Sequence, residues 1–173
     1  MFTFMQWLKE QPQVNPFQRS TQQSNRLRDK MLQPYHGNLP SEQPNHSSET
    51  HDCYITHEKN GGGNVTFYCK KTKQCHGLIR FGGNPSHKEI TIRHAITKPS
   101  GSLHGHQLYT HLLDNGHTLH SDTSLNPASL KMWKHLCGHS KTTVVCHDGT
   151  SVTTNNIESL CGKHNRFTAK KET

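Results

Sequence analysis

The chain has 173 residues, of which 29% are hydrophobic and 7% aromatic, and it carries a formal net charge of +8 with a pI near 9.3. This length and composition exclude a large multidomain core and predict one small packed unit with polar extensions. The positive charge favours contact with nucleic acid, with anionic cofactors or with acidic partners, although a basic surface kept for solubility fits equally well.

Membrane-spanning segments and signal peptides both have recognisable sequence patterns. No stretch approaches the ~20 apolar residues that span a bilayer, and the start, MFTFMQWLKEQ, lacks the basic and apolar regions of a signal peptide. Six cysteines follow no regular spacing, so we expect free thiols in a reducing, cytoplasmic compartment and no membrane contact. The sixteen histidines make the chain histidine-rich, so its charge should rise steeply below neutral pH.

The first part of the chain, residues 1–51, is predicted to be a polar, basic extension that ends in a linker. Residues 1–11 suit a short helix that Pro12 interrupts. Residues 17–33 suit a second helix, polar and basic, with only a thin apolar stripe. Residues 34–51 are rich in Pro, Ser, Asn and His, which is the composition of a linker.

A series of short strands is predicted from residue 52 onward. Turn signals, NGGGN and GGNP, separate stretches that alternate between apolar and polar residues. The predicted strands cover residues 53–56, 65–69, 77–81 and 88–97. They form an antiparallel meander of up to four strands, and the last of them is the longest.

The hydrophobic period then changes from that of a strand to that of a helix. Leucines and a tyrosine at helical spacing predict a helix over residues 104–115, and Asn115-Gly116 ends it. A short strand at 118–121 is followed by a second helix, which Asn126 caps and Pro127 begins, and by a last strand at 142–146. Residues 148–173 are predicted to be a polar, basic C-terminal segment.

A strand–helix–strand crossover requires a parallel or splayed pair of strands in the sheet. The predicted fold class is therefore α/β in the broad sense (α+β). It has a mixed, mostly antiparallel sheet with two crossover helices, and the domain covers residues 52–147.

The loop between the longest strand and the first of these helices has the features of an anion-binding site. Its sequence is Ser100-Gly101-Ser102-Leu103-His104-Gly105-His106. Backbone N–H groups at the start of a helix attract negative charge, and the two histidines would add to that attraction. An ordinary strand-to-helix loop is the alternative interpretation.

Two motifs in this region resemble those of the GNAT family of N-acetyltransferases, especially its compact phage-type members. The segment SGSLHGHQLY (100–109) is similar to the RGKGxGxxLY pattern of the family's cofactor loop. The segment 126–136, NPASLKMWKHL, is similar to its N-x-x-A-x-x-L-Y-x-x-L helix, and GHTLHSD (116–122) resembles the strand between them. The resemblance covers roughly residues 52–147 and implies an acetyltransferase-like fold.

The resemblance also implies a function, a cofactor and a set of site residues. The function is acyl-CoA-dependent N-acyltransfer from acetyl-CoA to the amine of a protein or small molecule, in a phage or bacterial protein. A base on the long strand would deprotonate the amine, and a backbone N–H of that strand would hold the oxyanion. Glu89 and His94 are the candidate bases. The expected cofactor-binding residues are Ser100, Gly101, Ser102, His104, Gly105, His106 and Asn126.

The sequence departs from the family pattern at three positions. Ser100 stands where the family has Gln or Arg, and Leu103 stands where it has the central glycine. Trp133 replaces a tyrosine that often serves as the general acid, and its indole cannot supply a proton, so we expect Trp133 to be a core residue. A catalytically degenerate protein on the same fold is therefore the companion hypothesis.

Two other function classes remain open. Cys161-Gly-Lys-His164 has metal-ligand spacing, so Cys137, His139, Cys161 and His164 form a possible zinc set. The segment 156–165 is similar to the last part of an HNH nuclease motif, in which His147 would be the general base. The third class is a non-enzymatic module that binds nucleic acid through the basic segments 17–33 and 166–171, mostly by salt-sensitive phosphate contacts.

Overall fold

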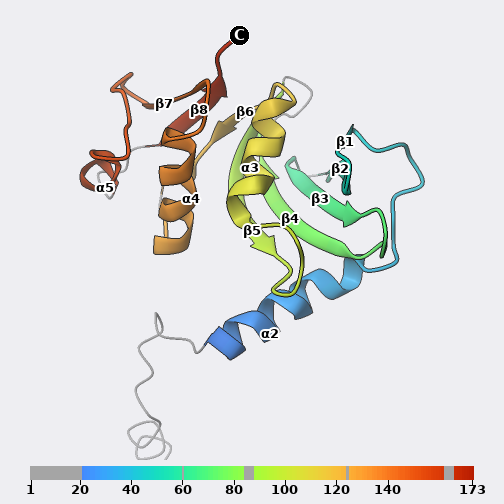
Figure 1. The fold of residues 1–173 in the computed structure, drawn as a ribbon. Coiled ribbons are helices and arrows are strands. Elements are labelled where there is room, and N and C mark those ends of the chain that lie inside the picture. The colour runs from blue at the N-terminus through green and yellow to red at the C-terminus, as the bar shows by residue number, and fades with distance from the viewer. Residues whose placement is uncertain (1–20, 60, 84–87, 124, 162–165) are drawn as a thin grey trace, which may run out of the picture.

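The computed structural model describes residues 21–59, 61–83, 88–123, 125–161 and 166–173. The helix predicted over residues 1–11 lies outside this range. The described residues form an α+β fold around one eight-stranded sheet, whose strand order is β1-β2-β3-β4-β5-β6-β8-β7. All neighbouring strands are antiparallel except β5 and β6, which are parallel (Figure 1). The mixed, mostly antiparallel sheet predicted from the sequence is thus confirmed.

The helices and strands follow one another in the order that the change of hydrophobic period predicts. The strands are β1 (His46–Ser47), β2 (His51–His57), β3 (Gly63–Cys69), β4 (Cys75–Gly82), β5 (Glu89–Thr97), β6 (Thr118–His120), β7 (Thr142–Cys146) and β8 (Phe167–Lys171). The α-helices are α2 (Thr21–Leu32), α3 (Gly105–Asp114), α4 (Pro127–Cys137) and α5 (Ile157–Leu160), and a 3-10 turn, η1, covers Gln33–Tyr35.

Helices cover both faces of the sheet (Figure 1). The larger core lies under α3 and α4, where alternate residues of β3, β4 and β5 pack against Leu108, Leu112 and Trp133. The smaller core lies on the opposite face, where Leu32 at the end of α2 packs against the other set of alternate strand residues: Tyr54, Tyr68, Cys75, Leu78 and Ile96. Strand side chains alternate between faces, and a register shift in the β4–β5 pair moves Ile96 to the face opposite Ile90 and Ile92, so β2 to β5 contribute to both cores.

The packed unit extends past both ends of the predicted range 52–147. Ahead of it, α2 and β1 belong to the fold, and Leu32 is completely buried. After it, β8 lies between β6 and β7, with Phe167 and Ala169 completely buried. The basic segment 166–171, predicted to be a polar tail, is therefore a strand of the sheet.

Two expectations from composition can be compared with the described residues directly. All six cysteines are free thiols, as predicted. Within the described ranges, no helix combines the length and the apolar character needed to cross a bilayer.

Candidate functional site

The feature that creates the site is the divergence of β5 from β6. The two strands pair only over Glu89–Thr91 and Thr118–His120. β5 continues to Thr97, whereas the chain after β6 turns away toward the start of α4. The part of β5 beyond Thr91 therefore has a sheet partner, β4, on one side only, and a wedge opens between β5 and α4.

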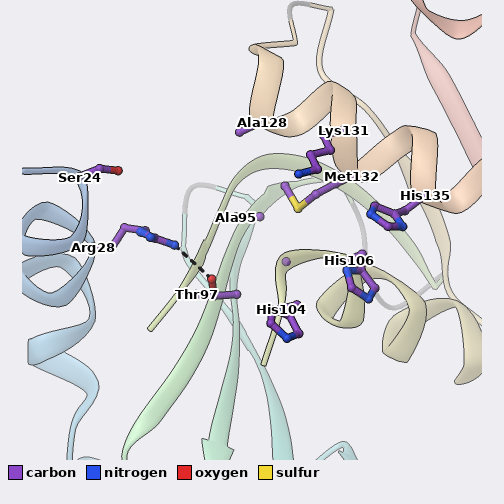
Figure 2. Close-up of a pocket in the computed structure, with 11 residues that line it drawn as sticks. Ser24, Arg28, Ala95, Thr97, His104, His106, Ala128, Lys131, Met132 and His135 are labelled. Carbon is purple, nitrogen blue, oxygen red and sulfur yellow. Dashed lines mark hydrogen bonds between the residues drawn. The ribbon is translucent and has the colours of Figure 1, made fainter. Parts of the chain in front are cut away.

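The wider cavity of this wedge has a volume of about 580 Å³. Four parts of the chain that are distant in sequence line it, namely α2, the second half of β5, the beginning of α3 and α4 (Figure 2). Its lining residues are Ser24, Arg28, Ala95, Thr97, His104, Gly105, His106, Ala128, Lys131, Met132 and His135. No acidic residue is among them, so the cavity is suited to an anion.

Arg28 and Lys131 supply its fixed positive charges from opposite sides. The Arg28 guanidinium donates to Asn25 Oδ1 at 2.6 Å and, weakly, to Thr97 Oγ1 at 3.5 Å. Its Nε is buried and has no hydrogen-bond partner among the described residues. Leaving a buried charged donor unpaired is costly, so a ligand acceptor at this position would be favoured.

Three histidine rings form a row along the cavity wall (Figure 2). The rings of His106 and His135 are stacked with centroids 4.6 Å apart, and those of His104 and His106 lie 5.9 Å apart and nearly parallel. Burial, followed by the proximity of His135 and His104, lowers the pKa of His106. A bound phosphate would oppose this shift, because it stabilises the protonated imidazole.

The beginning of α3 faces the same cavity. The Gln107 side chain accepts a hydrogen bond from the backbone N–H of His104 at 2.7 Å, which fixes the first turn. The N–H groups of Gly105 and His106 come next and have no acceptor within the helix, because they belong to its first turn. A side chain at Gly105 would meet Met132 Sδ at 2.5 Å, so this glycine permits close contact between α3 and α4.

The remaining loop residues have different surroundings from those expected of cofactor ligands. Ser100 and Ser102 are exposed and do not line either cavity of the wedge. Gly101 packs on the ring of His76, where a Cβ would lie 3.3 Å from Cγ. Leu103 packs against the larger core and is not a lining residue, so it does not obstruct the cavity.

A second, narrower cavity of about 260 Å³ lies deeper along β5. His94, a predicted base, lines it and is exposed. Asp122 also lines it and accepts a hydrogen bond from Arg93 Nη1 at 2.8 Å, a contact that is also an ion pair. Trp133 is 1% exposed, as expected of a core residue, and Tyr109 packs against it with ring centroids 6.2 Å apart.

The structure separates the two candidate bases. Glu89, at the start of β5, does not line either cavity of the wedge, and its carboxylate lies 3.9 Å from His120 Nε2. Asn126 lines the narrower cavity, but its Oδ1 accepts from the backbone N–H of Ser129 at 2.8 Å. That contact is the N-cap that begins α4. His94 is therefore the predicted base that the fold brings to the wedge.

The potential metal ligands occur at a different place from the predicted zinc set. Within the described part of the chain, Cys137, His139 and Cys161 do not belong to any group of three closely spaced ligands, and His164 lies outside that part. One group of three does occur, made by His51, Cys69 and His76. Their ligand atoms all lie within 4.8 Å of one another, so this cluster could hold a metal ion.

Several lining residues were not predicted from the sequence. Arg28 belongs to α2, which was predicted to be part of a polar extension. Lys131 and His135 belong to α4, where their sequence positions suggest the exposed side of an amphipathic helix. The one available signal was their helical spacing of i and i+4, which puts both on one side of α4. Which side faces the wedge depends on the tertiary packing.

Comparisons with known proteins give no relative for this chain. No protein-family model, no curated protein and no solved structure matches it.

Proposed function

We propose that this chain is an acyl-CoA-dependent N-acyltransferase that binds its cofactor in the wedge between β5 and α4. The observation that carries the proposal is the early end of the β5–β6 pairing at Thr91, which leaves both cavities along the unpaired side of β5. The crossover helix α3 joins this parallel pair and begins at the wider cavity. The GNAT-like motifs at residues 100–109 and 126–136 lie on these same elements.

The charges of the wider cavity suit the phosphate end of an acyl-CoA. Arg28, Lys131 and the histidine row line it, together with Gly105 and His106 in the first turn of α3. Phosphate groups bind well to helix N-termini and to guanidinium groups. The acyl end would then extend along β5 into the narrower cavity.

The chemistry would take place beside His94. His94 removes a proton from the substrate amine, and the amine nitrogen attacks the thioester carbonyl carbon. A backbone N–H of β5 beyond Thr91 donates to the oxyanion. The C–S bond then breaks and the CoA thiolate leaves. The thiolate takes up one proton through solvent while His94 releases the amine's proton to solvent, since Trp133 has no proton to supply.

The first test is calorimetric titration of the purified chain with acetyl-CoA. We expect micromolar binding, weakened about tenfold or more by Arg28→Ala and by Lys131→Ala, because each removes a charge-assisted phosphate contact. Arg26→Ala and Lys134→Ala are matched controls on the same two helices, since neither side chain lines the wedge. Absence of binding at millimolar acetyl-CoA, or equal weakening by the controls, would contradict the proposal.

The second test separates an active enzyme from a degenerate one. Mixtures of acetyl-CoA with protein and small-molecule amines are incubated with the chain, and free CoA and acetylated product are quantified by mass spectrometry. We expect His94→Gln to lower turnover by about 10²–10⁴-fold while acetyl-CoA binding is retained. Cofactor binding without product on any amine, together with no effect of His94→Gln, would leave the degenerate hypothesis as the correct one.

A further inference from the structure

The cluster of His51, Cys69 and His76 lies at one edge of the larger core, where β2, β3 and β4 are adjacent. His51 and Cys69 are direct cross-strand partners, so their side chains lie on the same face of the sheet. His51 and His76 are 3% and 8% exposed, whereas Cys69 is half-buried. No residue of the wedge belongs to this group.

A β-bulge brings the third residue to the same face. The register between β3 and β4 shifts between Phe67 and Tyr68, which leaves His76 without a partner on β3. Cys75 and Leu78 belong to the core under α2, whereas a Cβ on Gly77 would contact Leu108 on α3. His76 and Gly77 are therefore consecutive residues on one face, as a bulge allows.

The two imidazoles already aim ligand atoms at each other. His51 Nε2 and His76 Nδ1 are 2.9 Å apart, within hydrogen-bond distance. His51 Nδ1 lies 2.8 Å from Thr50 Oγ1. With its Nδ1–H donated to that hydroxyl, His51 presents the Nε2 lone pair to the cluster, which is the outer-shell arrangement typical of metal-ligating histidines.

Cys69 contributes the negative charge that the two neutral rings lack. The Thr72 hydroxyl and nearby backbone N–H groups lower the pKa of its thiol, so a metal ion would displace the thiol proton more readily than at an ordinary cysteine. Burial is the main cause that lowers the pKa of both histidines, which keeps the imidazoles neutral. Lys98 is the cation closest in effect to His76, and its Nζ forms an ion pair with Asp29 Oδ1 at 3.8 Å.

We propose that His51, Cys69 and His76 bind a zinc ion, with a fourth position open to solvent beside the half-buried Cys69. Two imidazoles and one thiolate are ligands that zinc prefers, and tetrahedral geometry leaves one position for water. Zinc with Zn–N bonds of 2.0–2.1 Å needs the two nitrogens roughly 3.4 Å apart. The rings would separate by about half an ångström, and His76 would carry its proton on Nε2.

The ion would join three strands and support a loop of the wedge. Gly101 lies against the His76 ring, and the backbone N–H of Lys98 donates to the His76 carbonyl at 2.9 Å. A metal that holds His76 thereby holds the turn ahead of α3. Zinc binding itself needs none of the wedge residues, so this proposal stands or fails independently of acyl-CoA binding.

The test is titration of the metal-free chain with Co²⁺, which reports both geometry and ligand type by absorbance. We expect one equivalent to give the visible bands of tetrahedral Co²⁺ and the near-ultraviolet thiolate-to-cobalt band. Cys69→Ser should remove the thiolate-to-cobalt band. Thr50→Val should weaken the affinity for Co²⁺ by about tenfold or more but should keep that band. Cys137→Ser and Cys161→Ser are matched controls that should change nothing.

Two results of the cobalt titration would overturn the proposal. One is the absence of a tetrahedral cobalt spectrum in the unaltered chain. The other is loss of the thiolate band in Cys137→Ser or Cys161→Ser with retention in Cys69→Ser, which would locate the metal elsewhere. X-ray absorption of the zinc-loaded chain needs no variant, and we expect one sulfur at about 2.3 Å with the remaining ligands nitrogen or oxygen. Two sulfur ligands would exclude the site.

Discussion

Three histidines, His51, His76 and His117, are buried among the described residues. His117 is 4% exposed, and its Nε2 lies 2.8 Å from His46 Nε2, so β1 and the start of β6 meet through two imidazoles. Its Nδ1 is buried without a partner among the described residues. Burial, and then the proximity of His46, Lys88 and His111, lowers the pKa of His117 to about 4.

This shift predicts that the protein becomes less stable as the pH falls. Between about pH 6.5 and pH 4 the unfolded chain binds a proton at His117 that the folded chain does not, so the free energy of unfolding decreases with falling pH. The shift corresponds to a loss on the order of 2–3 kcal/mol over that range. Urea unfolding at a series of pH values measures it.

The variant His117→Gln should reduce the slope of the unfolding free energy against pH by about 1 kcal/mol per pH unit in the middle of the range. The reason is that it removes one titrating group. His147→Gln is the control, since His147 is exposed and should leave the slope unchanged. Equal slopes for the unaltered chain and His117→Gln would show that His117 is not buried in its neutral form.

At the residue scale, some residues of the candidate sites could be predicted from the sequence and others could not. His104, Gly105 and His106 were predicted from a local pattern, because they lie at a helix start that the sequence shows directly, whereas His94 was predicted only from the resemblance, which implies a base on the long strand. The three proposed zinc ligands, His51, Cys69 and His76, were not predicted, since their proximity depends on the β2–β3 register and on one β-bulge. Neither feature leaves a local sequence signal.

Among the elements, α2 connects the first part of the chain to the sheet. Its residues are mostly polar and its apolar stripe is thin, which is why the sequence suggested an extension rather than a covering helix. Leu32 nevertheless is completely buried in the smaller core, and Arg28 on the same helix lines the wedge. Docking of α2 therefore positions a charged residue of the proposed cofactor site.

Replacement of Leu32 by alanine tests this docking. We expect Leu32→Ala to lower the free energy of unfolding by about 2–4 kcal/mol, because it removes apolar contacts and leaves a cavity. Leu27→Ala lies on the same helix, and its side chain is 42% exposed, so it should cost about 0.5 kcal/mol or less. Denaturant unfolding compares the two, and equal effects would show that α2 is not packed on the sheet.

Most helices and strands were predicted close to their observed positions, whereas the short elements β1, η1, α5 and β8 were not predicted. β5 and α3 lie within one residue of their predicted bounds, and α4 begins at the predicted residue, Pro127, because their apolar periods continue over nine or more residues. β8 was assigned to a basic tail. Its sequence, FTAKK, has only two inward residues, Phe167 and Ala169, which is too short an alternation to separate from chance.

At the scale of the whole molecule, β8 makes the sheet continuous. It pairs with β6 on one side and with β7 on the other, and the ring of Phe167 packs against Trp133 with centroids 6.0 Å apart. The part of the sheet that carries β7 is thus joined to the rest through this strand. The candidate wedge depends on it, because Trp133 lines the narrower cavity.

Removal of residues 166–173 should therefore abolish cooperative folding. Loss of the buried Phe167 side chain alone costs about 3–5 kcal/mol, and a typical domain is stable by only about 5–15 kcal/mol. Differential scanning calorimetry should show no sharp unfolding transition. Removal of the exposed Thr173 alone is the control and should preserve the transition. A truncated chain that unfolds as sharply as the control would show that β8 is dispensable.

The position of β8 also has a consequence for synthesis of the chain. Each of β2 to β5 pairs with the strand made just before it, whereas β7, apart from a local bridge to Ser151, pairs with a strand made later. At about 5–20 residues per second, β7 presents an open edge to solvent for roughly one to four seconds before β8 is made, and β6 for roughly two to nine seconds. Such edges are templates for pairing with other nascent chains. Slow decoding of residues 147–166 would therefore promote aggregation on polysomes, and rapid decoding would suppress it.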